Sequence, residues 1–570
     1  MNKLKLIILI LILFMIGLRK TFPQISDNEI ISFADSLLKS SYESDGPGLS
    51  LLISRNGNPV YKEAFGLADI EHSIPLSTEN VFNIGSMSKQ FTAVCILQLA
   101  ESGKLNLKDD IRKYLPDYNA HGKIITIENC LNHTSGIPSF TEIKGFDLLF
   151  QKNLSVKEMT DYFSKNDLLF EPGTDFSYSN SGYFLLALIT EKASGMNFDK
   201  YLKENIFDKA GMKNSYSDVS GIEIPLKAVG YDRKSESEYQ ITTDYEKSWT
   251  VGAGNLMSTT GDLLKWNDAL NSGKIVSKQL LQIAWTPFIL PNGLNTNYGY
   301  GWNITPLNKR TIIKHGGAIN GFLSDADYIP EEEIYIAALS NSTGKSPDLI
   351  TGKILQRILG INDIVPAEIP LDVGSINDYT GSFEVNRESV RLIKNFSDEK
   401  QYRYIFLDGD SLKIQKSGGE KLTLKSYGKD KFFIDNSSSR FDYIRDGSGK
   451  ITALDVYTYP VNFGPHDICQ KVNVSMPIEK EEISLSEDIL KPYEGEYELM
   501  PGFNLKIFVE KGVLFIQATG QEKYQLFPES NTKFFMKVVD AQAEFIPDSD
   551  GSVNKLIFTQ GQKFECKRIK

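Results

Sequence analysis

The sequence GSMSKQF at residues 85–91 decides the fold predicted for this chain, because a strand pattern ends there and a helical pattern begins. The preceding letters, VFNI, are typical of a short strand, and the letters FTAVCILQLA that follow are apolar on every side of a helix. Such a helix is buried in the middle of a domain, and Gly103 marks its end. Ser86 and Lys89 are one turn apart, so both side chains project from one face.

Strand patterns lie on both sides of this helical region. An Asn-Gly turn within residues 55–58 separates GLSLLIS from PVYKEAFG, which predicts a β-hairpin before the helix. Helical and loop patterns mix between about residues 106 and 250, and strand patterns then return in GYGWNI, RTIIKHGG, SDADYIP and EIYIAALSN. A last helix is predicted at residues 347–359. We therefore predict one α/β domain at residues 25–362, with an antiparallel sheet flanked by helices and a helical insert.

The remainder of the chain is rich in strand patterns and contains an internal repeat. YTGSF at residues 379–383 resembles YEGEY at residues 493–497, and the first copy carries an insertion after this motif. Three further matches recur at a constant spacing of 102 residues. Leu412 corresponds to Leu514, the KFF at residues 431–433 corresponds to the KFF at residues 533–535, and Gly449 corresponds to Gly551. The repeat predicts two antiparallel β-barrel-like modules, at residues 371–476 and 484–570, which carry no clustered Ser, His and acid set.

The composition and the N-terminus limit where the protein acts and what it binds. A chain of 570 residues requires several domains, and its net charge of −11 disfavours nucleic acid as a partner, because Lys and Arg hold nucleic acids. Lys3 and Lys5 precede an apolar run at residues 6–18, which is shorter than the roughly 20 residues of a bilayer span. Residues 1–24 are predicted to be an export signal, either cleaved or retained as a membrane tether. The rest of the chain is then periplasmic or secreted.

The four cysteines show no spacing that is typical of a metal site, and no metal is predicted. Cys95 lies in the apolar helix, where it is expected to be buried as a small hydrophobic residue. A disulfide between Cys469 and Cys566 stays open as an alternative, because a sequence contains no geometric evidence for or against it.

Ser86 is one of seven serines that are followed three positions later by a lysine, so the spacing alone does not identify a site. The spacing matters because a neutral amine within hydrogen-bond distance can take the hydroxyl proton during attack on a carbonyl. Gly85 before Ser86 and the buried helix after it distinguish this serine, although a capping serine with a surface lysine is the simpler interpretation. The other six are Ser36, Ser342, Ser397, Ser426, Ser530 and Ser552.

Two further motifs favour a catalytic role for Ser86. Tyr178-Ser179-Asn180 is the one place where an Asn follows a Tyr by two residues, and it comes after a Pro-Gly loop and before an apolar helix. The second motif, KHGGA at residues 314–318, follows the strand pattern RTIIK. Its paired glycines allow a close backbone approach, as an oxyanion donor or a substrate-pairing edge requires. With a pKa near its usual value of about 6.5, His315 is expected to change charge in the working pH range.

With all three motifs, the sequence resembles the serine β-lactamase and penicillin-binding-protein superfamily, in its class C-like branch of esterases and D-aminopeptidases. The resemblance extends over about residues 28–360 and includes LNHTSGIP, PGTDFSYSN and VGAGNLMSTTGDLLKW. It implies an acyl-enzyme on Ser86, with Lys89 and Tyr178 sharing the base and acid roles, and no metal or organic cofactor. The backbone N–H groups of Ser86 and Ala318 are the implied oxyanion hole. The implied substrate-binding residues are Asn180, His315, Gly316, Gly317 and Ala318.

One departure from this superfamily bears on the substrate. β-Lactamases and D-Ala-D-Ala carboxypeptidases typically carry Lys-Thr-Gly where this chain has His315-Gly316-Gly317. Without the hydroxyl and the permanent positive charge, a substrate that ends in a free carboxylate is disfavoured. The sequence therefore predicts an exported serine hydrolase that cleaves an ester or a short peptide or amide, D-configured substrates included. A penicillin-binding carboxypeptidase or β-lactamase, and a catalytically silent protein that binds cell-wall fragments, are the alternatives. The oligomeric state stays open.

Overall fold

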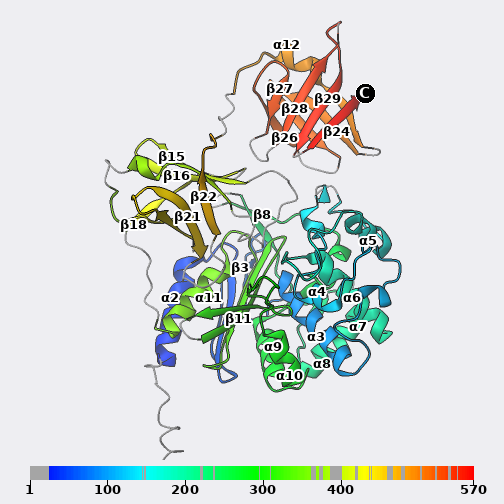
Figure 1. The fold of residues 1–570 in the computed structure, drawn as a ribbon, viewed down its shortest axis with the longest axis vertical. Helices are drawn as coiled ribbons and strands as arrows, with labels where there is room; N and C mark the ends of the chain where they lie inside the picture. The colour runs from blue at the N-terminus through cyan, green and yellow to red at the C-terminus, as the bar shows by residue number, and fades with distance from the viewer. Residues whose placement is uncertain are drawn as a thin grey trace, which may run out of the picture. The chain divides into compact units, whose positions relative to one another are not determined.

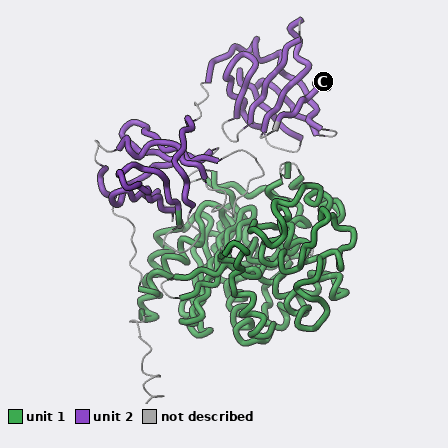
Figure 2. The backbone as a smooth tube through the Cα atoms, viewed as in Figure 1, with its two compact units in different colours: residues 1–367, 387–396, 457–466 green, residues 368–386, 397–456, 467–570 purple. Residues whose placement is uncertain are grey.

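The computed structural model describes most of the chain between residues 25 and 570 (Figure 1). The described residues are 25–143, 145–146, 149–217, 222–234, 238–293, 295–307, 310–360, 368–371, 376–385, 401–417, 421–435, 437, 439–458, 467–476, 482–500, 503–519, 523–536, 541–548, 550–560 and 562–570. The predicted export signal at residues 1–24 lies outside them. The chain divides into two compact units, the first formed mainly by residues 1–367 and the second by C-terminal residues (Figure 2).

A six-stranded antiparallel sheet is the centre of the first unit, with the strand order β10-β11-β12-β13-β1-β2. The predicted hairpin is confirmed, since Arg55 pairs with Asn58 and the turn residues Asn56 and Gly57 have φ angles of 53° and 73°. Strand β1 also pairs with β13, so the first and last strands of this unit are neighbours in the sheet. The strands are β1 (Leu49–Arg55), β2 (Asn58–Phe65), β10 (Asn303–Leu307), β11 (Arg310–Ile319), β12 (Phe322–Ile329) and β13 (Ile334–Ser340).

Helices cover both faces of this sheet, which is why its strands are apolar on both sides. Helices α2 (Asp27–Ser41) and α11 (Pro347–Ile358) contact each other and lie over one face (Figure 1). Along β1, Leu51 joins the core under these helices, whereas Leu52 joins the core formed with the helical insert. The prediction of a last helix at residues 347–359 is confirmed to within one residue.

The helical insert packs around α3 (Ser88–Glu101), which contacts α6 (Asn180–Ser194). The helical pattern at residues 85–91 suggests a helix from Ser86, but α3 begins two residues later, because Gly85 has a φ angle of +48° and the chain first forms a 3-10 turn at Gly85–Met87. The other helices are α4 (Ile127–Leu131), α5 (Val156–Ser164), α7 (Phe198–Leu202), α8 (Asp208–Ala210), α9 (Thr260–Asn271) and α10 (Lys278–Ala284), with a π-helical turn at Lys203–Phe207. Further 3-10 turns are Ile111–Lys113, Phe140–Glu142 and Lys247–Thr250.

Short strands complete the first unit in three small sheets, with the orders β3-β4, β5-β9-β6 and β7-β8. They are β3 (Leu67–Asp69), β4 (Ile74–Pro75), β5 (Phe82–Asn83), β6 (Tyr216–Ser217), β7 (Tyr231–Arg233), β8 (Tyr239–Ile241) and β9 (Leu256–Ser258). Strand β5 leads directly into the Ser86 turn and pairs with β9.

The C-terminal region contains a nine-stranded sheet and a closed eight-stranded barrel, as the predicted fold class requires. A 3-10 turn at Ile376–Tyr379 precedes the sheet, whose strand order is β17-β16-β15-β14-β22-β21-β20-β19-β18. Its strands are β14 (Gly381–Glu384), β15 (Tyr402–Asp408), β16 (Ser411–Lys416), β17 (Lys421–Thr423), β18 (Lys425–Gly428), β19 (Lys431–Phe433), β20 (Ser439–Arg445), β21 (Ile451–Thr458) and β22 (Asp467–Val472). Helix α12 (Glu487–Leu490) and a 3-10 turn at Lys491–Tyr493 precede the barrel strands β23 (Gly495–Met500), β24 (Phe503–Glu510), β25 (Val513–Ala518), β26 (Lys523–Pro528), β27 (Lys533–Phe535), β28 (Gln542–Pro547), β29 (Val553–Gln560) and β30 (Gln562–Arg568).

Equivalent aromatic contacts in the sheet and the barrel confirm the internal repeat. The Tyr379 ring lies 4.9 Å from Phe432 and 5.0 Å from Tyr443, measured between ring centroids. In the barrel, Tyr493 makes the matching contacts with Phe534 at 5.6 Å and Phe545 at 4.3 Å. The strand orders match as well if β17 and β18, the two edges of the nine-stranded sheet, together correspond to β26. The insertion of the first copy falls largely on residues 386–400, outside the described part of the chain.

All four cysteines are buried and free, so the alternative of a Cys469–Cys566 disulfide is wrong. Cys95 is fully buried in α3, as expected. Within the described ranges, no helix combines the length and the apolar character that a membrane span needs.

A buried charged cluster joins β11 and β12 on the face that α11 covers. Lys314 lies 3.6 Å from Asp325 and 3.4 Å from Asp327, and the Thr351 hydroxyl donates to Asp325 at 2.5 Å. Burial raises the pKa of Asp325 to about 7, against the lowering effect of Lys314. The folded protein therefore binds the proton of the Asp325 carboxyl group more tightly than the unfolded chain does. The free energy of unfolding falls as pH rises between about 4 and about 7, where only the unfolded chain has lost this proton.

Replacing Asp325 with Asn removes this dependence, because an amide does not ionise. We expect the loss of Tm between pH 5 and pH 8 to shrink by at least about 2 °C in Asp325→Asn, measured by calorimetry on the full chain. Asp35→Asn, which changes a half-exposed carboxylate that pairs with Lys39 on α2, is the matched control and is expected to leave the pH dependence nearly unchanged. An unchanged Tm loss in Asp325→Asn contradicts the prediction.

The approach of β11 to the segment before Ser86 leaves no room for a side chain at Gly317. A methyl group added there would lie 2.1 Å from the Ile84 carbonyl oxygen, which is backbone and cannot rotate away. We expect Gly317→Ala to lower the free energy of unfolding by about 2 kcal/mol or more, measured by denaturant titration. Gly352→Ala in α11 meets nothing within 4 Å and is expected to be neutral or stabilising by up to about 1 kcal/mol. Equal effects of the two substitutions would rule out the steric explanation.

Candidate active site

Ser86 lies in the 3-10 turn between β5 and α3, and hydrogen bonds hold this turn on both sides. The Ile84 N–H donates to the Leu256 carbonyl at 3.0 Å, and the Leu256 N–H donates to the Ser88 hydroxyl at 3.0 Å. The Ser88 hydroxyl donates in turn to the Gly85 carbonyl at 2.7 Å. Ser86 itself stays partly exposed, as a residue that meets a substrate must be.

Lys89 is completely buried, and its amine is surrounded by three oxygen atoms. Its Nζ atom lies 2.7 Å from Asn180 Oδ1, 2.8 Å from the Ala253 carbonyl oxygen and 3.2 Å from Ser86 Oγ. No acidic side chain in the described ranges forms an ion pair with it, and burial holds the pKa of Lys89 well below its usual range. A neutral amine has two N–H groups for the two carbonyl oxygens and one lone pair for the Ser86 hydroxyl.

Asn180 is the first residue of α6, and neighbouring hydroxyl groups fix its side chain. Its Nδ2 donates to Thr141 Oγ1 at 3.1 Å, and its backbone N–H donates to Ser139 Oγ at 3.1 Å. The Ser139 and Thr141 hydroxyls are 2.9 Å apart. Sequence reasoning missed both residues, although they follow the LNHTSGIP landmark directly. The Asn180 amide is thus oriented so that its oxygen faces Lys89.

Tyr178 lies against both Ser86 and Lys89. The Ser86 side chain interacts with its hydroxyl and opposes the rise in its pKa, and its ring centroid is 4.7 Å from Lys89 Nζ. Burial raises the pKa of Tyr178 above its usual value, so the phenol keeps its proton at neutral pH. His133 packs at 4.2 Å from this ring and accepts a hydrogen bond from the Ser179 N–H at 3.0 Å. His133 therefore braces the loop that carries Tyr178.

His315 lies near Tyr178, but the expectation that it changes charge in the working pH range is wrong. Burial, together with the nearby Lys89, lowers the pKa of His315 to about 3. Both ring nitrogens are engaged within the protein: Nδ1 lies 2.5 Å from the Gly316 carbonyl oxygen, and Nε2 lies 3.1 Å from the Tyr298 hydroxyl. The imidazole is therefore neutral at physiological pH.

The KHGGA motif lies within β11, and the strand continues to Ile319 instead of ending at the motif. The Ala318 backbone runs beside the Ser86 turn, since a methyl group added to Gly85 would lie 2.9 Å from the Ala318 nitrogen. Gly317 shares the face of His315, whereas Gly316 points to the opposite face, toward Asp325. The structure thus gathers all the predicted site residues except Gly316, which the alternation of side chains along the strand places behind the sheet.

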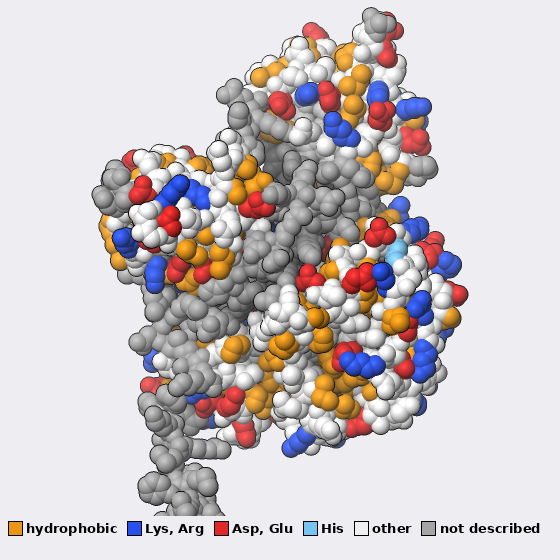
Figure 3. Space-filling model, viewed as in Figure 1, with side chains coloured by type: hydrophobic (Ala, Val, Ile, Leu, Met, Phe, Trp, Pro, Cys, Tyr) orange, Lys and Arg blue, Asp and Glu red, His pale blue; other side chains and the backbone are white. Residues whose placement is uncertain are grey.

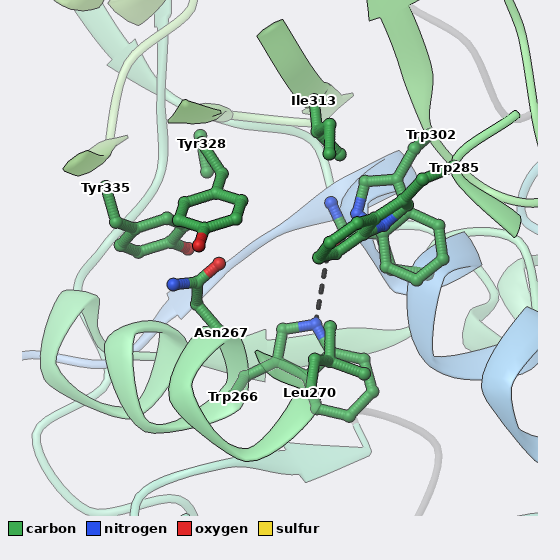
Figure 4. A pocket seen from close by; sticks show the side chains of 10 residues that line it. Trp266, Asn267, Leu270, Trp285, Trp302, Ile313, Tyr328 and Tyr335 are labelled. Carbon is green, nitrogen blue, oxygen red and sulfur yellow. Dashed lines mark hydrogen bonds between the residues drawn. The ribbon is translucent and has the colours of Figure 1, made fainter. Parts of the chain in front are cut away.

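A separate pocket lies further along the same face of the sheet (Figure 4). Three tryptophans line it, and the Trp266 indole donates to Gln90 Oε1 at 3.1 Å. It contains none of the predicted site residues. On the face seen in Figure 3, acidic and basic side chains are interspersed with apolar ones over the described part of the chain. No cluster of three metal-ligating side chains occurs within that part.

Comparison with known proteins places these observations in a family. The model of the Beta-lactamase family matches residues 31–360, and a domain of unknown function, DUF3471, matches residues 479–569. The chain is 25% identical over 535 residues to Penicillin-binding protein 4* of Bacillus subtilis, covering 91% of this chain and 95% of the relative. Protein flp of Staphylococcus aureus is 29% identical over 301 residues, or 52% of this chain and 59% of that protein.

Two solved structures share the fold. The octameric penicillin-binding protein homologue of Pyrococcus abyssi superposes with a TM-score of 0.54 at 24% identity, covering 78% of this chain and all of that one. The D-amino acid amidase of Ochrobactrum anthropi gives a TM-score of 0.50 at 23% identity, covering 58% of this chain and 98% of the amidase. The predicted fold class is thereby confirmed. With a buried lysine against Ser86 and a family match over more than half of its length, the chain belongs to the Beta-lactamase family of serine hydrolases.

Proposed function

We propose that this protein is a serine hydrolase that forms an acyl-enzyme on Ser86. The observation that carries the proposal is the environment of Lys89, whose buried amine meets two carbonyl oxygens and the Ser86 hydroxyl. Because the Asn180 and Ala253 oxygens can only accept hydrogen bonds, they take the two N–H groups of the neutral amine. Its lone pair is left for the serine proton, which is the arrangement of a general base.

The proposed reaction moves one proton at a time. Lys89 takes the proton of Ser86 as Oγ attacks the substrate carbonyl, and the N–H groups of Ser86 and Ala318 stabilise the oxyanion. Tyr178, which keeps its proton at neutral pH, gives it to the leaving group as the scissile bond breaks, and Lys89 returns the proton to Tyr178. Water then attacks the acyl carbonyl and gives a proton to Lys89. As the C–Oγ bond breaks, Lys89 returns that proton to Ser86 Oγ, and the carboxylic acid product leaves. Lys89 is therefore the primary base in this proposal.

The proposed substrate is an ester or a short peptide or amide, D-configured substrates included. The neutral His315 supports it, because the position that holds a permanent cation in carboxylate-binding relatives has no charge here. The name of the relative Penicillin-binding protein 4* favours the alternative of penicillin binding. Acylation by a penicillin in a one-to-one ratio, seen by mass spectrometry, would replace our substrate assignment. Export, which rests on the N-terminal sequence, is part of the same proposal.

Replacing Ser86 with Ala removes the proposed nucleophile. We expect Ser86→Ala to lose all covalent labelling by a fluorophosphonate and to lose turnover of esters and amides, measured by intact mass and by product release. Ser36→Ala is the matched control, because Ser36 also precedes a lysine by three residues but is exposed on α2. It is expected to label like the wild type. Labelling that survives in Ser86→Ala would show that another residue is the nucleophile.

The pH dependence follows from the depressed pKa of Lys89. Protonation removes the lone pair, so kcat/KM falls as pH drops through the Lys89 pKa and levels off above it. Lys89→Arg, which stays protonated, is expected to lower kcat by about 10²-fold or more. His315→Gln should leave the position of the acid limb unchanged between pH 5 and pH 8, since His315 is already neutral there. A limb that moves in His315→Gln would assign the titration to the histidine.

A further inference from the structure

Tyr298 is a buried residue that none of the steps above uses. It is 1% exposed, and its ring is part of an aromatic cluster beneath the site with His133, Phe176, Tyr178, Tyr183 and His315. Its ring centroid lies 4.7 Å from His133 and 6.2 Å from Tyr178, edge-on to the latter. Its backbone is held on both sides, since the Phe288 N–H and the Thr296 hydroxyl both donate to the Tyr298 carbonyl.

The hydrogen bonds around His315 settle where its proton lies. The Gly316 carbonyl can only accept, so Nδ1, at 2.5 Å, carries the proton of the imidazole. The other nitrogen, Nε2, then presents a lone pair to the Tyr298 hydroxyl at 3.1 Å. Tyr298 also interacts with the Tyr183 hydroxyl, which itself donates to the Leu131 carbonyl at 2.7 Å. The imidazole nitrogen is the more basic of these two neighbours, so it receives the single proton that Tyr298 donates.

We infer that Tyr298 is a positioning residue that holds His315 as the neutral Nδ1–H tautomer and, through it, fixes the strand edge beside Ser86. The connection is a chain of hydrogen bonds from the Tyr298 hydroxyl to His315 Nε2, and from Nδ1–H to the Gly316 carbonyl. Gly316 is two residues before Ala318, whose backbone runs beside the Ser86 turn. The inference rests on the proposed function only where Ala318 supplies an oxyanion donor.

Burial is the main reason why His315 is neutral. The positive charge of Lys314 from β11 adds to this effect and the Gly316 carbonyl opposes it, whereas Lys89 from α3 and the phenols of Tyr178 and Tyr298 are themselves neutral. His133 is itself kept neutral by burial, and Ala326 is the partner of His315 on β12. Within the described residues no acidic side chain acts on His315, so the hydrogen bond from Tyr298 selects between two neutral tautomers instead of setting a charge.

The decisive experiment uses the small number of histidines in the chain, five in all. In full-length protein labelled with ¹⁵N-histidine, His315 of the wild type is expected to show one protonated Nδ1 and one bare Nε2, unchanged between pH 5 and pH 8. Tyr298→Phe removes only the hydroxyl, and we expect the His315 signals to move to a mixture of tautomers. His315→Gln assigns the signals.

The kinetic test needs no known substrate, because it follows acylation of Ser86 by a fluorophosphonate. In Tyr298→Phe the maximal acylation rate is expected to fall about tenfold, while the probe concentration for half-maximal rate changes less than about twofold. In the His315→Gln background, adding Tyr298→Phe should lower the rate by less than about twofold, because the residue through which Tyr298 acts is gone. Tyr300→Phe, which loses a hydrogen bond to Glu128 instead, is the control and is expected to behave like the wild type.

Two outcomes would overturn the inference: an unchanged His315 tautomer in Tyr298→Phe, or equal rate losses from Tyr298→Phe with and without His315. Failure of the proposed function looks different. If Ser86 is not the nucleophile, labelling persists in Ser86→Ala, whereas the tautomer measurement still tests Tyr298 by itself. A melting curve of each variant shows that the folded protein is compared in every case.

Discussion

The buried amine of Lys89 is the interaction on which the rest of the site depends. An isolated ammonium group inside a protein is strongly disfavoured, and no carboxylate in the described part of the chain pairs with this one. The amine therefore stays neutral and meets its hydrogen-bonding needs with the Asn180 and Ala253 carbonyl oxygens. These two acceptors come from segments far apart in the sequence, so the environment of the amine forms only once the helical insert has packed around α3.

The sheet contributes a second constraint, the close approach of β11 to the turn that carries Ser86. Glycines at positions 85 and 317 allow the two backbones to touch, and a side chain at either position would collide with backbone atoms. The alternation of side chains along β11 then separates two polar environments. His315 lies on the catalytic side in a neutral setting, and Lys314 pairs with Asp325 and Asp327 behind the sheet. One strand thus keeps a charged network and an uncharged one apart.

The neutral His315 is the feature on which the proposed preference against a carboxylate substrate rests. A permanent cation beside Tyr178 would lower the pKa of the phenol and attract an anionic substrate. Here the imidazole is neutral and hydrogen-bonded to the protein at both nitrogens, and Tyr178 keeps its proton. The proposed roles of Lys89 as base and Tyr178 as acid are consistent with this burial, which lowers the pKa of the amine and raises the pKa of the phenol, so that both groups are neutral.

The sequence by itself determined the fold class, the internal repeat and the residues of the candidate site, because turn signals, periodicity and motifs are local properties of the chain. The Asn56-Gly57 hairpin, the helix at residues 347–359 and the Tyr379 and Tyr493 repeats all followed from such patterns. Only the tertiary structure decided the protonation states, the face on which Gly316 lies, and the parts played by Thr141 and Tyr298. These depend on burial and on contacts between distant segments, and a pKa near 6.5 for His315 holds only in water. The packed aromatic rings and Lys89 around that histidine bring its pKa to about 3.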